Sequence, residues 1–450
     1  MITLILLMLC ALFVYYYKVK YFNYWKVRGV KHNEPIFLFG NNLKNILLQS
    51  SRVDLLVDIY WRYPDEKVVG FYRSSTPELI IRDPQIIKKV LITDFMYFYA
   101  RGFHPDKNNI EPLFRNLFVV EGDIWKSLRT RMTPAFTSGK LKCMFPLIIE
   151  KTKKLQQTTL AKAKGNHPLD ARDLMARYTT DFIGSCGFGL DAEALDNEKS
   201  KNDFVDQLLE YKQKGPTVIE SMENVNADGK PNNFVFEFDN DLFVAQVLVF
   251  IAAGFETSSS ATSYTLHELA FNPDIQRKVQ ENIDDVLEKH NNRLSYEAVK
   301  EMTYLDWAFK EGLRKFPSLG YLIRKCTKQY NFEDLGFTID EGVSIMIPVQ
   351  ALQMDPKYWR NPEEFRPERF SPEEFTNLQK DVFLAFGAGP RNCIGGRLGL
   401  MQSLAGLAAI LSKFDVEPAP QSVRHPKVVP TSDIVQSIKG GIPLVFRERT

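Results

Sequence analysis

The sequence predicts a mainly α-helical protein with a minor β region. Apolar residues recur at helical spacing through most of the 450 residues, and the longest such run spans residues 241–269. Asn240 or Asp241 can cap this helix, Asn272-Pro273 ends it, and Gly254 is expected to break its middle. Residues 330–349 alternate well enough to form two strands with a turn at Glu341-Gly342.

The composition is that of a globular protein with a sizeable core, with 44% apolar and 25% charged residues. The length allows two or three domains or one large helical domain. We predict a single catalytic domain over residues 43–450. A net charge of +2 gives no general basis for binding nucleic acid. One basic cluster is either a docking face for an acidic partner or a solvated helix face; it comprises Lys126, Arg129, Arg131, Lys140 and Lys142.

The N-terminus predicts a membrane anchor. Residues 1–17 carry no charge and end in three tyrosines, which suit a membrane interface, and the lysines that follow should stay cytosolic. A cleaved signal peptide is the alternative, but a basic start and a small-residue cleavage site are both missing. Residues 18–42, basic and containing Pro35 and Gly40, are predicted to be an irregular linker.

Further elements follow from periodicity and from helix-ending residues. Residues 71–81 have strand-like content, and residues 101–120 are predicted to be a long loop. The predicted helices span residues 84–91, 124–133, 147–162, 169–184, 273–289, 302–316 and 395–414. The five cysteines lack metal-site spacing and are expected to be reduced; they are Cys10, Cys143, Cys186, Cys326 and Cys393.

The most informative stretch is FGAGPRNCIG, residues 386–395. It places the thiol of Cys393 in a glycine-rich turn, two residues after Arg391 and seven after Phe386. Backbone N–H groups and a nearby cation can stabilise a thiolate there. Such a thiolate is a suitable axial ligand for haem iron, where it favours O–O cleavage. A lone buried cysteine after a glycine turn is the alternative.

A second cluster, AGFETS, lies inside the long helix. A glycine, an acid and hydroxyls are costly in a buried helix unless the helix opens locally beside a ligand. Thr257 could then donate a hydrogen bond to bound dioxygen, and Glu256 could pass protons inward. The alternative is a kinked helix in which Thr257 bonds back to its own backbone.

Three weaker signals involve charged side chains. Glu311 and Arg314 share a helix face and would ordinarily be a surface ion pair. PERF, which contains Arg369, would ordinarily be a turn. Trp125 and Arg129 project from one side of a helix and could clamp one carboxylate, or could simply stack on the surface.

In this order, these motifs resemble those of a cytochrome P450. The sequence around them is most similar to the insect microsomal branch of that family, which oxidises xenobiotics and plant toxins. The resemblance covers nearly the whole chain after the anchor. It implies haem b, with Cys393 as the iron ligand and Phe386 and the loop glycines, Gly389 among them, tuning the thiolate. The remaining implied roles are propionate binding by Trp125, Arg129, Arg324 and Arg391, oxygen activation by Glu256 and Thr257, and a structural triad of Glu311, Arg314 and Arg369.

The resemblance also implies substrate contacts and reveals a departure. Substrate would meet residues 101–120, 250–257 and 318–322 and the Gly440-Gly441 turn. In the family, further helices roof the substrate cavity after a segment like GFGL at 187–190. Here a polar stretch follows at once, so some tens of residues of the roof should be missing near 190–202.

We therefore predict a haem-thiolate monooxygenase of the endoplasmic reticulum membrane with its catalytic domain facing the cytosol. Its partners would be an NADPH-dependent reductase, with cytochrome b5 as a further candidate, dioxygen and an apolar small molecule. Two alternatives stay open. One is a haem-thiolate isomerase or peroxide-rearranging enzyme, and the other is a haem-binding or ligand-sequestering protein whose shortened roof impairs turnover.

Overall fold

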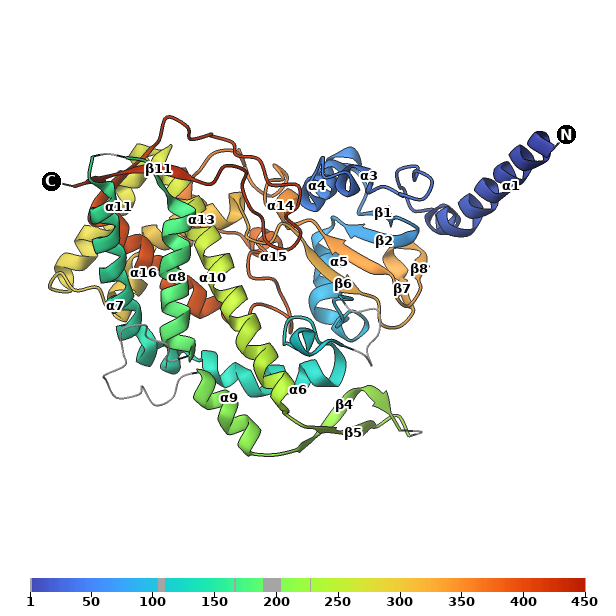
Figure 1. The fold of residues 1–450 in the computed structure, drawn as a ribbon, viewed down its shortest axis with the longest axis horizontal. Helices are drawn as coiled ribbons and strands as arrows, with labels where there is room; N and C mark the ends of the chain where they lie inside the picture. Colours follow the sequence, from blue (N-terminus) through green and yellow to red (C-terminus); the bar gives the residue numbers. More distant parts are fainter. Residues whose placement is uncertain (1, 104–109, 166, 189–203, 227, 450) are drawn as a thin grey trace.

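The mainly helical prediction is confirmed. The computed structural model describes residues 2–103, 110–165, 167–188, 204–226 and 228–449. Long helices form one half of the molecule, and a small sheet lies in the other half, beside the N-terminal helix (Figure 1). The predicted deletion near residues 190–202 lies outside the described residues. The large helical half contains α6 (Gly122–Met132), α7 (Ser138–Ala163), α8 (Ala171–Phe188), α9 (Phe204–Gln213), α10 (Asn240–Ala270), α11 (Pro273–Lys289), α12 (Tyr296–Glu301), α13 (Thr303–Lys315) and α16 (Gly396–Leu411).

The sheets are short and come from distant parts of the chain. The largest has the order β1-β2-β9-β6, in which β2 and β9 run parallel and the other neighbours antiparallel. The second has the order β10-β11-β3, and β4-β5 and β7-β8 are hairpins. The strands are β1 (Val68–Arg73), β2 (Thr76–Ile81), β3 (Leu169–Asp170), β4 (Thr217–Val225), β5 (Pro231–Phe236), β6 (Leu322–Lys325), β7 (Tyr330–Phe332), β8 (Phe337–Ile339), β9 (Ser344–Ile347), β10 (Phe414–Pro418) and β11 (Pro443–Glu448).

The remaining helices are short, except for the N-terminal one. They are α1 (Ile2–Phe22), α2 (Tyr24–Val27), α3 (Leu43–Ile46), α4 (Arg52–Arg62), α5 (Pro84–Lys88), α14 (Val349–Leu352) and α15 (Asn377–Val382), with the single turns η1 (Lys89–Thr93), η2 (Phe95–Tyr97), η3 (Pro112–Phe114), η4 (Thr133–Phe136), η5 (Glu333–Leu335) and η6 (Pro367–Phe370). The predicted two strands in residues 330–349 are instead three, because η5 turns β7 back onto β8 before β9 joins the large sheet.

The central helix α10 differs from its prediction in two respects. Its cap is Asp239, whose carboxylate accepts the N–H of Leu242 at 2.8 Å, rather than Asn240 or Asp241. The predicted break at Gly254 is wrong, since the helix is continuous through it. A Cβ at this position would lie 2.6 Å from Cδ1 of Ile183 on α8. The glycine therefore allows two helices to approach closely and does not interrupt either.

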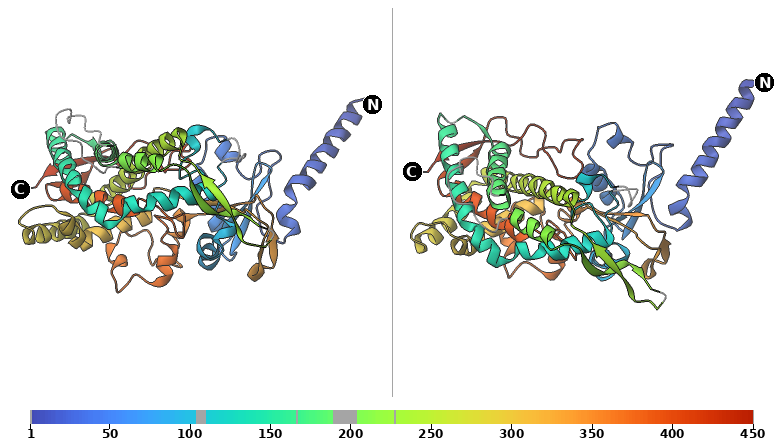
Figure 2. Two further views of the ribbon diagram at one scale, coloured as in Figure 1. Left: turned by 90° about the horizontal axis from the view of Figure 1, so that it is seen from below. Right: turned by 60° about the horizontal axis from the view of Figure 1, so that its bottom comes forward.

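The segment predicted to be a linker, residues 18–42, is helical at its start and irregular from residue 28 on, and it packs against the sheet. Trp25 is fully buried and donates its indole N–H to the carbonyl of Phe71 at 3.0 Å. Gly70 leaves the room for its ring, which a Cβ would approach to 2.5 Å. Arg28 pairs with Asp340 at 2.7 Å. The helix α1, 21 residues long, projects from this packed segment (Figures 1 and 2).

One described helix, α10, is long and apolar enough to cross a membrane, with a mean hydropathy of 1.6 in its best window. Its C-terminal half, from Ser258 to Ala270, is buried in the domain. By position it is the core helix against which α8, α13 and α16 pack.

Replacing Trp25 with alanine should destabilise the protein by about 3–5 kcal/mol, because a large buried ring and its hydrogen bond are lost. Urea denaturation of the purified chain measures this change. Trp61→Ala is the matched control, since the Trp61 side chain is 42% exposed. Equal losses in the two variants would contradict the packing described for the segment before the sheet.

Candidate haem and oxygen-activation site

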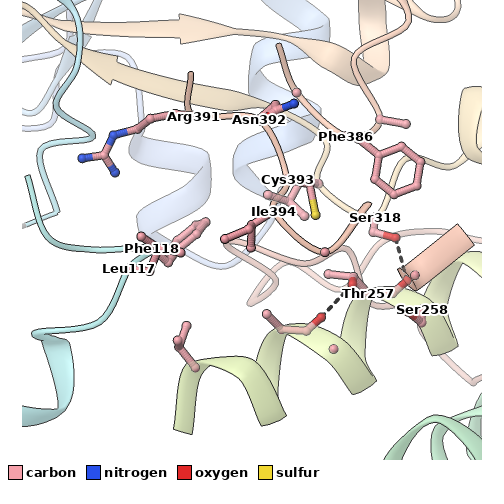
Figure 3. Close-up of a pocket in the computed structure, with 18 of the residues that line it drawn as sticks. Leu117, Phe118, Thr257, Ser258, Ser318, Phe386, Arg391, Asn392, Cys393 and Ile394 are labelled. Atoms are coloured by element: carbon pink, nitrogen blue, oxygen red, sulfur yellow. Dashed lines mark hydrogen bonds between the residues drawn. The ribbon is translucent and has the colours of Figure 1, made fainter. Parts of the chain in front are cut away.

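A cavity of about 280 Å³ lies between the Cys393 loop and the middle of α10. Figure 3 shows the loop with Phe386, Arg391 and Cys393 on one side and Thr257 and Ser258 of α10 on the other. Its volume is close to the lower limit of typical small-molecule sites. The lining is mostly apolar and includes Phe103, Leu117, Phe118, Phe136, Ile183, Phe250, Leu319 and Ile434.

The Cys393 loop is closed by backbone hydrogen bonds. The N–H of Cys393 donates to the carbonyl of Phe386 at 2.8 Å, and that of Asn392 donates to Gly389 at 3.0 Å. Gly389 has a φ of +71°, and a Cβ there would lie 1.8 Å from the carbonyl oxygen of Leu91. Only glycine fits this position, so the loop geometry is set by both conformation and packing.

The thiol of Cys393 faces the cavity. Burial raises its pKa above the ordinary value for a cysteine. The N–H of Gly395 and the cations Arg129 and Arg101 act in the opposite direction and favour the thiolate. A bound metal cation at this position would add the largest stabilisation of the anion, since coordination deprotonates a thiol.

Four arginines converge on one edge of the cavity: Arg101, Arg129, Arg324 and Arg391. Burial, together with the positive charge of Arg324, lowers the pKa of Arg391 to about 9, and burial lowers that of Arg324 to about 10. Burial and the same two cations lower the pKa of Arg101 well below its usual value. Such a concentration of buried positive charge is unfavourable unless an anion joins it.

Several donor atoms of this arginine cluster are unused. Within the described residues, Nε and Nη1 of Arg391 and Nε of Arg324 are buried without a hydrogen-bond partner. Buried guanidinium groups ordinarily satisfy their donors. The free donors, the four positive charges and the thiol opposite α10 together fit a flat, doubly anionic group with a metal at its centre. Haem, with two propionates and an iron, has this chemistry.

Trp125 and Arg129 both contact the Cys393 loop. The guanidinium of Arg391 stacks on the ring of Trp125, with 4.5 Å between its Cζ atom and the ring centroid. Arg129 donates to the backbone and side-chain oxygens of Asn392, at 2.9 and 2.6 Å. Both residues therefore hold the Cys393 loop against α6.

On the α10 side, Thr257 lines the cavity, and its hydroxyl donates to the carbonyl of Ala253 at 2.7 Å. This is the back-bonded arrangement of the alternative prediction, without the kink. Ser318 adds a hydrogen bond to the carbonyl of Thr257 at 3.0 Å. Glu256 does not line the cavity; its carboxylate pairs with Arg172 on α8.

Glu311, Arg314 and Arg369 form a buried ionic network that joins α13 to η6. The carboxylate of Glu311 accepts from Arg314 at 2.7 and 2.9 Å and from Arg369 at 3.1 Å. All three side chains are at most 1% exposed. Backbone carbonyls of Gln353, Pro362 and Asn361 accept the remaining donors. Glu311 and Arg314 are therefore a buried pair and not the surface pair that their spacing alone would indicate.

Sequence reasoning missed Arg101 as a member of the arginine cluster. Its guanidinium donates to the carbonyl of Phe118 at 2.7 Å. A single arginine in a loop carries no spacing signal, and only the fold brings it beside Arg391. Of the expected substrate stretches, residues 101–120, 250–257 and 318–322 contribute to the lining. The Gly440-Gly441 turn does not, since Gly441 packs against Asp170 instead.

The mainly helical fold, the cysteine loop facing a long helix and the arginine cluster define a haem-thiolate protein. Comparison with known sequences identifies the family. The sequence model described as Cytochrome P450 matches residues 31–217 and 191–445. The chain is therefore a member of the cytochrome P450 family, the monooxygenases that carry haem b with an axial cysteine thiolate.

Its relatives include insect proteins that it matches over most of their length. It is 33% identical to Cytochrome P450 6B6 of Helicoverpa armigera in an alignment 481 positions long, gaps included, that covers 95% of each chain. It is 34% identical to Probable cytochrome P450 6a20 of Drosophila melanogaster over 497 positions, covering 98% of this chain and 99% of the relative. Cytochrome P450 6B1 of Papilio polyxenes is 34% identical over 466 positions, covering 91% of this chain and 92% of the relative.

Replacing Glu311 with glutamine should destabilise the fold by about 3–5 kcal/mol, because two buried guanidinium groups lose their counter-charge. Urea denaturation again measures the change. The control is Glu374→Gln, which removes the partner of Arg366 in a partly exposed pair and should cost less than about 1 kcal/mol. A loss from Glu311→Gln as small as that of the control would contradict the burial of the network.

Proposed function

We propose that this P450 is a membrane-anchored monooxygenase that inserts one oxygen atom of O2 into an apolar small molecule, with electrons from an NADPH-dependent reductase. The observation that carries the proposal is the thiol of Cys393, which faces Thr257 of α10 across an apolar cavity edged by four arginines. When bound there, haem supplies the chemistry of dioxygen activation. The protein supplies placement, charge and exclusion of water.

Cys393 would hold the iron, with Phe386 and the loop glycines shielding the thiolate. Arg391, Arg324, Arg129 and Trp125 would bind the propionates. Arg101 would also bind them, because it lines the same edge of the cavity. The unused donors of Arg391 and Arg324 support this assignment, because carboxylates are the anions that a guanidinium binds best. Glu311, Arg314 and Arg369 would fix the loops below the haem without touching it.

Thr257 and Glu256 would handle protons on the α10 side. The hydroxyl of Thr257 borders the cavity and can donate into it when it releases the carbonyl of Ala253. Glu256 can carry a proton on its carboxylate, but it must first leave Arg172 and turn toward the cavity. Proton delivery therefore requires a side-chain movement of Glu256, whereas Thr257 needs only a rotation of its hydroxyl.

The lining supports an apolar substrate. Between the arginine edge and α10 it consists of aromatic and aliphatic side chains, such as Phe118, Phe250 and Ile434. Burial of apolar surface favours ligands that match such a lining. A xenobiotic, a plant toxin, an insecticide or an endogenous lipid or hormone fits this description.

A second candidate function, haem binding or ligand sequestration with impaired turnover, is favoured by a shortened roof. The alignments with two relatives are 481 and 497 positions long, gaps included, which is more than the 450 residues of this chain. The two family matches also overlap at residues 191–217. Val244 and Leu248 of α10 are 49% and 46% exposed. We infer that a segment of the roof is missing and that the cavity admits more water than a closed site.

The cellular setting is part of the proposal. The proposed anchor, residues 1–17, would span about 25 Å as a helix at 1.5 Å per residue, near the lower limit for crossing the hydrocarbon core of a bilayer. Anchoring by residues 1–17 in the endoplasmic reticulum membrane would leave the catalytic domain in the cytosol, where the reductase and cytochrome b5 could reach it. The basic cluster is a weaker docking candidate than expected, since Lys126 donates to the backbone carbonyl of Glu220 and Lys142 pairs with the carboxylate of Glu297.

The reduced carbon monoxide complex of the wild-type chain should show the strongly red-shifted Soret band of a thiolate-ligated haem. Cys393→Ser should lose this band while still binding haem through the arginine cluster. The absorbance spectrum of each purified protein measures both. Cys143→Ser is the matched control, because Cys143 is an exposed thiol on α7. A wild-type chain without haem or without the band would refute the proposed function.

Turnover separates the monooxygenase from its alternatives. In a reconstituted membrane with reductase, the proposal predicts that an apolar substrate stimulates NADPH consumption and yields an oxygenated product. Product formed only from added hydroperoxide would instead indicate a peroxide-rearranging enzyme. A normal haem spectrum with neither activity would indicate sequestration.

A further inference from the structure

The β4-β5 hairpin packs on the outer side of α6, the helix that carries Trp125 and Arg129 (Figures 1 and 2). Its ladder follows the normal register from Thr217 to Glu220 and shifts before Val225. Residues 221–224 therefore fall outside the regular pairing with β5. A bulge of this kind leaves backbone donors that need other partners.

Those donors are satisfied by a buried carboxylate of α6. Asp123, only 2% exposed, accepts the hydroxyl of Ser221 at 2.6 Å and the N–H of Met222 at 2.5 Å. The Ser221 hydroxyl in turn accepts the N–H groups of Glu223 and Asn224, at 3.1 and 2.8 Å. The irregular part of the hairpin is thus fixed to the first turn of α6.

Glu223, placed by this bulge, joins two segments that carry the arginine cluster. It accepts the hydroxyl of Tyr99, two residues before Arg101, at 2.8 Å. Its other oxygen lies 3.4 Å from the N–H of Asp123 at the start of α6. A Cβ on Gly122 would lie 1.9 Å from this carboxylate, so the contact is close. Glu121 adds a second tie by accepting the N–H groups of Arg101 and Gly102.

We propose that Glu223 is a positioning residue for haem binding: it holds the Tyr99–Arg101 segment against α6, so that Arg101, Trp125 and Arg129 meet the propionates together. This inference rests on the proposed haem site and deepens it. Glu223 itself touches neither the cavity nor the thiol loop, since it is not among the lining residues. Its effect must therefore pass through the placement of the propionate-binding side chains.

The test measures how fast haem leaves the full-length protein for an excess of a haem-scavenging apoprotein. Glu223→Ala is compared with wild type, and Glu220→Ala is the matched control, an exposed acid on the same strand. Loss of one charged hydrogen-bonding group should speed haem release about tenfold. Glu220→Ala should release haem at the wild-type rate.

The same measurement with haem dimethyl ester, whose propionates carry no charge, separates positioning from general support of the fold. We expect the acceleration by Glu223→Ala to disappear with the ester. Equal acceleration with both haems, or none with either, would overturn the inference. Tyr99→Phe, a milder change that removes only the hydroxyl, should give a smaller acceleration that is also confined to the charged haem. Failure of the wild type to bind haem would instead refute the proposed function itself.

Discussion

The structure depends on buried positive charge at the edge of the cavity. Burial lowers the pKa of Arg101, Arg324 and Arg391, and the positive charge of Arg324 also lowers the pKa of the other two. Such a cluster is destabilising until an anion joins it. The cavity, the cysteine loop and the helix α6 are all arranged around this requirement, and a dianionic haem satisfies it.

Two sets of buried arginines in the same domain differ in how many of their hydrogen-bond donors have partners. Arg314 and Arg369 share the carboxylate of Glu311, and backbone carbonyls accept further hydrogen bonds from both, so the chain itself supplies their partners. Arg391 has the ring of Trp125 and one carbonyl, that of Val120 at 2.6 Å, and retains free donors. The first group is a structural brace. The second has the incomplete coordination of a binding site.

Much of this arrangement could be predicted from the sequence. The helices α10, α11 and α13 have regular apolar spacing and end near proline or asparagine. Each of their ends therefore agrees with the prediction to within one residue. The Cys393 loop has so many fixed identities that its chemistry could be inferred before its geometry. Local sequence determines these features, and local reasoning finds them.

What could not be predicted depends on contacts between distant segments. Gly254 was expected to break α10, but Ile183 on another helix explains it. Residues 18–42 have the composition of a linker, yet Trp25 is fully buried against the sheet. Arg101 lies beside Arg391, and Glu223 bonds both Tyr99 and the start of α6, only because the fold brings these distant segments together. Such roles belong to tertiary packing, which overrides local pattern.

The most direct test of this account uses metal-free protoporphyrin IX, which has both propionates but no iron for Cys393 to bind. The thermal midpoint of the apoprotein is measured with this porphyrin and with its dimethyl ester. If the buried guanidinium groups govern the site, the free acid should raise the midpoint clearly and the ester should raise it little. Equal stabilisation by the two porphyrins, or none by either, would contradict the account.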